Sequence, residues 1–126
     1  MAKKIIVIED NDNIRNIIQY ILKQKGYEVD SAADGEDGLK KIQAKKPDII
    51  LLDVMLPGIS GFDICTDLKE DPQYASIPVV LLTAIAKDSG KSDEYWRQKS
   101  GADAFLSKPF KAKDLVDKVV SLIGTN

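Results

Sequence analysis

The sequence contains no histidine and a single cysteine, and each scarcity excludes a class of chemistry. Without histidine, the chain cannot use a Ser-His-Asp triad, an imidazole general base or a phosphorylated histidine of its own. The single Cys65 excludes a disulfide within the chain and fits a reducing compartment, so we expect a cytoplasmic protein. No hydrophobic run is long enough for a signal peptide or a membrane span, so we expect no membrane partner.

The chain also lacks a strong excess of either charge. Its formal net charge is −2, from 18 basic and 20 acidic residues, which argues against nucleic acid as a partner. A length of 126 residues suits one domain with one core. Because there is no linker, repeat or low-complexity tract, we expect residues 1–126 to form a single domain with no output domain attached.

Short apolar runs alternate with segments of helical periodicity along the chain. The apolar runs cover residues 5–8, 27–29, 49–52, 79–82 and 104–106. The helical segments lie near residues 14–22, 36–45, 61–71, 86–100 and 111–123, and the segment 86–100 has the least apolar content. Repeated alternation of strand and helix predicts an α/β fold with a parallel sheet covered by helices on both faces.

Carboxylates stand at the ends of two of these predicted strands. Glu9 and Asp10 follow the first apolar run, and Asp53 ends the third, shortly before a Pro57-Gly58 turn. Parallel strands joined by right-handed crossovers end at one edge of the sheet, so we expect these side chains to converge. Like charges held close together need a cation, and Mg²⁺ prefers oxygen ligands. The sequence therefore predicts a magnesium site.

Two further polar side chains are expected at the same edge. Thr83 ends the fourth apolar run, and Lys108 follows the fifth. A divalent cation, a hydroxyl and an ammonium group together suit a phosphoryl group, because they offset the charge on its oxygens. Asp53 would then be the nucleophile that attacks phosphorus.

Together these motifs resemble response-regulator receiver domains of two-component and chemotaxis signalling. The resemblance rests on Val7-Ile8-Glu9-Asp10-Asn11, Leu52-Asp53-Val54-Met55-Leu56-Pro57-Gly58, Leu82-Thr83-Ala84, Gly101-Ala102-Asp103 and Lys108-Pro109-Phe110. It covers the whole chain, in the order of the family and at nearly its spacing. It implies a flavodoxin-like fold, a (βα)5 three-layer sandwich with a five-stranded parallel sheet in the order 2-1-3-4-5.

The resemblance also implies roles for the residues at the predicted site. Asp53 would accept a phosphoryl group from a histidine kinase or a phosphotransfer protein in a Mg²⁺-dependent reaction. The metal would be held by Asp10, Asp53 and the backbone carbonyl of Met55, with Glu9 often acting through water. In addition, Thr83 and Lys108 would contact the phosphoryl group, and the peptide bond between Lys108 and Pro109 would be cis.

A switch follows from the same resemblance. Phe105 is predicted to swing into space that Thr83 leaves when it moves toward the phosphoryl group, although plain core packing is the alternative for an apolar strand residue. The change would alter a surface made of the helix at 86–100, the strand at 104–106 and the helix at 111–123. The candidates to meet a downstream target protein or a second copy are Val116, Val120 and Ile123. We therefore expect a monomer or a phosphorylation-dependent dimer. We also expect that the protein is not an enzyme and catalyses only its own phosphorylation and dephosphorylation.

Three other functions compete with this one. A phosphatase of the haloacid-dehalogenase type would need a second Asp two residues after the nucleophile, where Met55 stands. A flavin-binding module would need a phosphate-binding turn after the first strand, where Glu9-Asp10-Asn11-Asp12 would repel phosphate. A degenerate receiver that binds protein without phosphorylation is the remaining alternative, and the intact acidic set argues against it.

The chain departs from the family at several positions. Phe105 lacks the hydroxyl of the tyrosine that is often found there, so any hydrogen bond of that hydroxyl is lost. The segment between Thr83 and Gly101 is longer than in many relatives and could form a partner-specific loop. Two residues after Asp53 and Thr83 stand Met55 and Ile85, which are both apolar.

These two apolar residues predict slow self-dephosphorylation. In the family both positions flank the phosphoryl group, and neither Met55 nor Ile85 offers a carboxylate or an amide that could orient an attacking water. The measurement is the decay of phosphorylated protein in a chase with Mg²⁺. A phosphoryl lifetime of seconds would refute the prediction.

Overall fold

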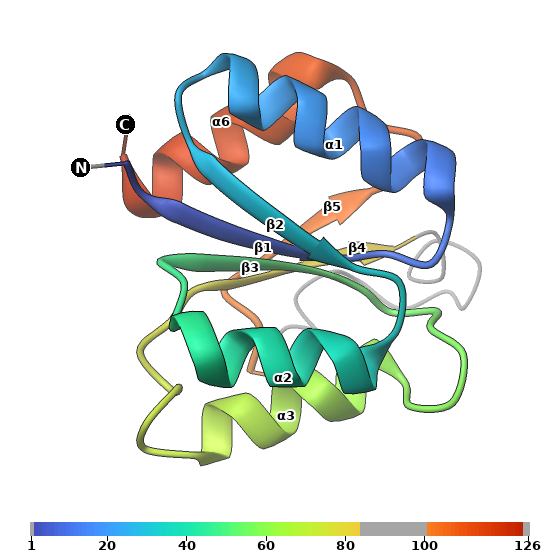
Figure 1. The fold of residues 1–126 in the computed structure, drawn as a ribbon, viewed down its shortest axis with the longest axis vertical. Helices are drawn as coiled ribbons and strands as arrows, with labels where there is room; N and C mark the ends of the chain where they lie inside the picture. Colours follow the sequence, from blue (N-terminus) through green and yellow to red (C-terminus); the bar gives the residue numbers. More distant parts are fainter. Residues whose placement is uncertain (1, 84–100, 125–126) are drawn as a thin grey trace.

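Five parallel strands form one sheet in the computed structural model, which describes residues 2–83 and 101–124 (Figure 1). The strand order is β2-β1-β3-β4-β5, so the flavodoxin-like topology predicted from the sequence is confirmed. The strands are β1 (Lys4–Ile8), β2 (Glu28–Ala32), β3 (Ile49–Asp53), β4 (Val79–Thr83) and β5 (Ala104–Ser107).

Four described helices cover the two faces of this sheet. Helices α1 (Asp12–Gln24) and α6 (Ala112–Ile123) lie on one face, and α2 (Gly35–Lys45) and α3 (Gly61–Glu70) lie on the other (Figure 1). The predicted helix at residues 86–100 lies outside the described residues. Among the helices that can be described, none has the length and apolar character needed to cross a membrane.

Polar side chains fix where three of the helices begin. The side chain of Asn11 accepts a hydrogen bond from the backbone N–H of Ile14 at the start of α1. Asp34 caps α2 in the same way, and Ser60 caps α3. Such caps satisfy backbone donors that have no partner within the helix. As a result, α1 starts directly after the strand end that bears Glu9 and Asp10.

The hydrophobic core lies in two layers, one on each face of the sheet. Side chains alternate between the faces along a strand, so Ile6 and Ile8 of β1 pack toward α2 and α3. Ile5 and Val7 pack toward α1 and α6. Every residue of the central strands β3 and β4 is buried, which explains their continuous apolar runs.

The second strand differs from its prediction. The apolar run at 27–29 predicted a strand there, whereas β2 covers Glu28–Ala32. The strand lies at the edge of the sheet and is only partly buried, so it contains polar residues that hide it from an apolar pattern. Tyr27 precedes the strand, is buried, and donates a hydrogen bond from its hydroxyl to the carbonyl oxygen of Gly124 at 2.8 Å.

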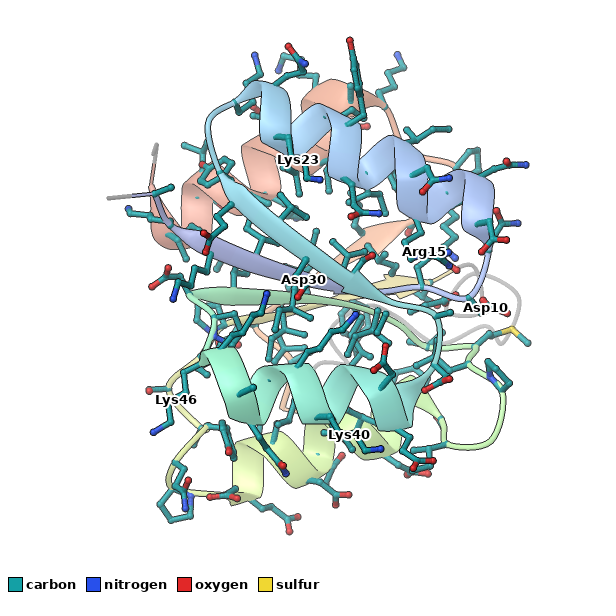
Figure 2. All side chains as sticks on the ribbon, viewed as in Figure 1. Asp10, Arg15, Lys23, Asp30, Lys40 and Lys46 are labelled. Atoms are coloured by element: carbon teal, nitrogen blue, oxygen red, sulfur yellow. The ribbon has the colours of Figure 1, made fainter. Side chains whose placement is uncertain are left out.

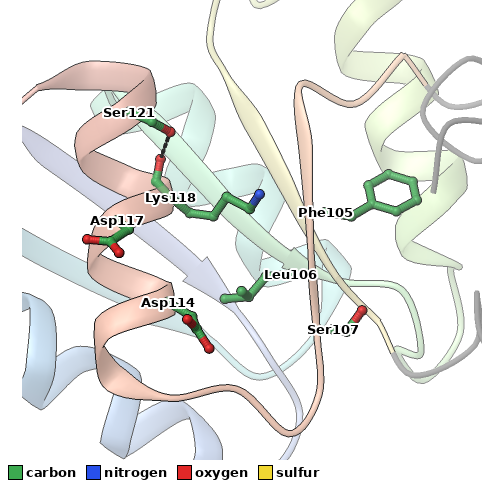
Figure 3. Close-up of a pocket in the computed structure, with 7 residues that line it drawn as sticks. All are labelled: Phe105, Leu106, Ser107, Asp114, Asp117, Lys118 and Ser121. Atoms are coloured by element: carbon green, nitrogen blue, oxygen red, sulfur yellow. Dashed lines mark hydrogen bonds between the residues drawn. The ribbon is translucent and has the colours of Figure 1, made fainter.

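The apolar residues of the last helix include the candidates for a partner surface, and the structure shows what two of them contact. The residues predicted to meet a partner there were Val116, Val120 and Ile123. Val116 lines a groove with Ile21 of α1, and Ile123 packs against the core cluster between α1, α6 and the sheet. The side of α6 toward β5 bears Asp114, Lys118 and Ser121 (Figure 3). The role of Val116, Val120 and Ile123 in meeting a partner stays a prediction.

Gly61 holds the start of α3 against the end of β3. A Cβ atom at this position would lie 2.1 Å from the carbonyl oxygen of Asp53 and 2.7 Å from the Cα of Val54. The backbone N–H of Gly61 also donates to the carbonyl oxygen of Val54 at 3.1 Å. The strand end that bears Asp53 is thus packed directly on the helix backbone.

This contact predicts that Gly61→Ala lowers the free energy of unfolding by about 1–3 kcal/mol, since backbone atoms cannot move aside as a side chain can. The matched control is Gly35→Ala, where the added Cβ would meet the Cδ1 of Ile64 at 2.6 Å and no backbone. A methyl group can rotate away, so the control should cost much less. Urea unfolding checks both variants, and equal losses of stability would contradict the prediction.

Candidate functional site

Three carboxylates meet at the carboxyl edge of the sheet. Glu9 and Asp10 follow β1, and Asp53 ends β3. One oxygen of each carboxylate lies within 4.8 Å of the others, close enough for the three to share a metal ion. Glu9 and Asp53 are buried, whereas Asp10 is exposed. The structure therefore brings together the acidic residues that the sequence placed at one edge.

Lys108 lies between two of these carboxylates. It follows β5, and its Nζ donates to Oε1 of Glu9 at 2.5 Å and to Oδ2 of Asp53 at 3.1 Å. Burial lowers the pKa of Lys108, but the hydrogen bond to Glu9 and the charge of Asp53 raise that pKa more, so it lies above its usual value. The ammonium group thus stays charged and offsets two buried negative charges. The Lys108–Pro109 peptide bond is cis, as predicted.

Backbone N–H groups orient both buried carboxylates. Asn11 donates to Oε2 of Glu9 at 3.0 Å, and Met55 donates to Oδ1 of Asp53 at 3.1 Å. Each carboxylate is therefore held by a backbone donor on one oxygen and by Lys108 on the other. Met55 itself is 63% exposed. The role of the Met55 carbonyl as a metal ligand stays a prediction.

The remaining predicted residues lie on β4 and β5. Thr83 is buried at the end of β4, and its carbonyl oxygen accepts a hydrogen bond from the backbone N–H of Lys108 at 3.0 Å. Thr83 is therefore at the same edge of the sheet as the carboxylates. Phe105 is buried in the core cluster on the α2 and α3 side, and it points away from α6 (Figure 3). Its movement as a switch stays a prediction, and Ile85 lies outside the described residues.

Sequence reasoning missed one residue of this region, Arg15. Its guanidinium donates to the carbonyl oxygen of Glu9 at 2.9 Å and to Oδ1 of Asp12 at 2.5 Å. The sequence feature that could have identified Arg15 is the start of the helix. Because Asn11 caps α1, Arg15 lies one helical turn after the cap and therefore near the end of β1.

The donor set fits a hard divalent cation. All three groups are carboxylates, and the chain has no histidine that would favour zinc or copper. The one cysteine, Cys65, belongs to α3 and is buried in the core cluster between that helix and the sheet. Oxygen ligands on a partly exposed edge suit Mg²⁺, which keeps several waters when it binds protein. A metal site is therefore consistent with the residues present.

Comparison with known proteins gives one family over almost the whole chain. The model of the response regulator receiver domain matches residues 5–120. The Alkaline phosphatase synthesis transcriptional regulatory protein PhoP of Bacillus subtilis (strain 168) is 39% identical over 123 residues, which are 98% of this chain and 49% of that protein. The chain thus spans about half the length of this curated relative. Since that relative regulates transcription by name, the expectation of no nucleic-acid partner stays a prediction, as does the expectation of a single domain.

Solved structures agree with the fold. The chemotaxis response regulator CheY4 of Vibrio cholerae matches with a TM-score of 0.87 and 30% identity, over 97% of this chain and 99% of that one. The receiver domain of the sensor histidine kinase PA1611 from Pseudomonas aeruginosa PAO1 matches with a TM-score of 0.86 and 27% identity, over 99% of this chain and 100% of that one. That domain has a magnesium ion coordinated in its active site cleft.

The unequal pairing of the three carboxylates predicts the effect of Asp10→Asn. Lys108 offsets Glu9 and Asp53, so Asp10 adds a further negative charge beside them. In chelator, removing this charge should raise the melting temperature by a few degrees, because it relieves repulsion. Added Mg²⁺ should stabilise the wild type but have little effect on the variant, which lacks a ligand.

Thermal unfolding with and without Mg²⁺ measures both effects. The matched control is Asp67→Asn, which removes an equal charge from an exposed position on α3. A variant that responds to Mg²⁺ as the wild type does would show that Asp10 takes no part in binding the cation.

Proposed function

The chain belongs to the response regulator receiver domain family, and from this membership we propose that Asp53 accepts a phosphoryl group from a histidine kinase or a phosphotransfer protein. One observation carries the proposal: the buried Asp53 carboxylate lies within reach of two other carboxylates and of the Lys108 ammonium. A buried acidic cluster with a single lysine does little for stability, because desolvation offsets most of the attraction. The arrangement suits a reacting centre better than a structural one.

The proposed step is the transfer of a phosphoryl group to a carboxylate oxygen of Asp53. That oxygen attacks phosphorus and forms an acyl phosphate, while the bond from phosphorus to the donor breaks. The leaving group keeps the electron pair of that bond. With a phosphohistidine donor, the leaving imidazole takes up a proton, and with acetyl phosphate the leaving group is acetate.

The acidic residues would hold the cation that this step needs. Asp10, Asp53 and the Met55 carbonyl would bind Mg²⁺, with Glu9 acting through water. When bound, Mg²⁺ offsets the negative charge on the oxygens of the phosphoryl group. The N–H of Asn11 holds one oxygen of Glu9, so this carboxylate would keep a hydrogen bond when Lys108 turns toward the phosphoryl group.

Lys108 and Thr83 would bind the phosphoryl oxygens after transfer. Phosphorylation adds nearly two negative charges at Asp53, which attract the Lys108 ammonium away from Glu9. Thr83 ends β4, the strand next to β3, and it is the residue of β4 that has a hydroxyl group. Movement of Thr83 and Phe105 would then change the surface around β5 for a downstream target protein or a second copy. The protein would act as a switch rather than an enzyme, catalysing only its own phosphorylation and dephosphorylation.

Labelling with acetyl phosphate tests this function directly. Wild-type protein should gain the mass of one phosphoryl group in the presence of Mg²⁺ and none in chelator. Asp53→Asn should abolish labelling, because an amide oxygen cannot form a stable acyl phosphate here. Intact-protein mass spectrometry followed by peptide mapping provides the measurement.

Asp67→Asn serves as the control, since it changes an exposed acid on α3 and leaves the cluster intact. It should label as the wild type does. If the wild type is not labelled although it is folded and binds Mg²⁺, the alternative of a receiver that binds protein without phosphorylation would replace the proposal.

A further inference from the structure

Arg15 joins the first turn of α1 to the last carbonyl before Asp10. The guanidinium reaches two acceptors, the carbonyl oxygen of Glu9 at 2.9 Å and Oδ1 of Asp12 at 2.5 Å. The side chain is mostly buried, with 17% of its surface exposed, whereas that of Asp12 is 79% exposed. Figure 2 shows Arg15 beside Asp10 at the end of α1 that meets the strand. A buried arginine whose planar group spans two acceptors fixes the atoms that it contacts.

Two hydrogen bonds, one of them from Arg15, hold the two peptide groups that flank Asp10. The peptide before Asp10 is fixed through its carbonyl oxygen, which belongs to Glu9 and accepts from Arg15. The peptide after it is fixed through its N–H, which belongs to Asn11 and donates to Oε2 of Glu9 at 3.0 Å. Because the planes of both peptide groups are held, the direction of the Cα–Cβ bond of Asp10 is determined.

The Asp10 side chain has no such support of its own. Within residues 2–83 and 101–124, no hydrogen bond or ion pair reaches its carboxylate. Glu9 and Asp53 differ in this respect, because each accepts from a backbone N–H and from Lys108. The position of the Asp10 carboxylate therefore depends on the backbone that carries it.

We propose that Arg15 is a positioning residue for the divalent cation, which holds the Asp10 carboxylate in place through the carbonyl of Glu9. The inference rests on the proposed function, since it assumes that Asp10 binds the cation. Groups that orient metal ligands usually change metal affinity by about tenfold or more when they are removed. Arg15 contacts neither the cation nor the phosphoryl group in this account.

The charge of Arg15 predicts the opposite effect, and this makes the proposal testable. A positive group near an acidic cluster repels a cation, so removal of the charge alone would tighten cation binding. Removal of the orienting contact would weaken it. The sign of the change in Mg²⁺ affinity thus distinguishes positioning from charge.

The experiment measures Mg²⁺ affinity by isothermal titration calorimetry for the wild type, Arg15→Met and Arg15→Lys. We expect Arg15→Met to weaken binding by about tenfold. Arg15→Lys keeps the charge but cannot span both acceptors, so its affinity should lie between the other two. Lys23→Met removes an equal charge from an exposed position further along α1 and should bind as the wild type does (Figure 2).

Labelling with acetyl phosphate adds a second measurement. The Mg²⁺ concentration for half-maximal labelling should rise in Arg15→Met, while the rate at saturating Mg²⁺ should return to that of the wild type. Unchanged or tighter binding in folded Arg15→Met, or wild-type affinity in Arg15→Lys, would overturn the inference. Failure of the wild type itself to bind Mg²⁺ would instead overturn the metal site in the proposed function, so the two failures are distinguishable.

Discussion

The ion pairs of Lys108 with Glu9 and Asp53 are the interaction on which the site depends. They join the ends of three strands, because Glu9 follows β1, Asp53 ends β3 and Lys108 follows β5. Two buried carboxylates beside each other would repel strongly without a positive group. The lysine allows the site to exist without a cation, and the charge added by phosphorylation would draw that lysine away from Glu9.

The sheet places these groups, and the helices refine their positions. The parallel pairing places Ile8 beside Leu52 and Asp53 beside Leu82, so the ends of β1, β3 and β4 lie next to one another. The close packing of Gly61 on the backbone of Asp53 and the capping of α1 by Asn11 then fix the turns that follow two of these strands. Such rigid support is what a reactive carboxylate needs, since small displacements reduce reactivity strongly.

Much of this arrangement could be predicted from the sequence, because burial and strand ends leave direct patterns. The apolar runs located four strands, and the polar residues after them identified Glu9, Asp10, Asp53, Thr83 and Lys108. The bounds of β2 were wrong since an edge strand carries polar residues. The groove that Val116 forms with Ile21 could not be predicted, because a helical stripe shows which side chains are apolar but not which element covers each one. The contact of Arg15 with the Glu9 carbonyl depends on the shape of a turn, which residue types alone do not reveal.

The central claim is that Asp10 and Asp53 share one cation next to a carboxylate that accepts a phosphoryl group. The most direct test is a crystal structure of the protein with Mg²⁺ and beryllium fluoride. The account predicts a metal at about 2.0–2.1 Å from oxygens of Asp10, Asp53 and the Met55 carbonyl, with beryllium on Asp53 and Lys108 turned toward its fluorides. A structure in which Lys108 stays between Glu9 and Asp53, with neither metal nor beryllium at the cluster, would contradict it.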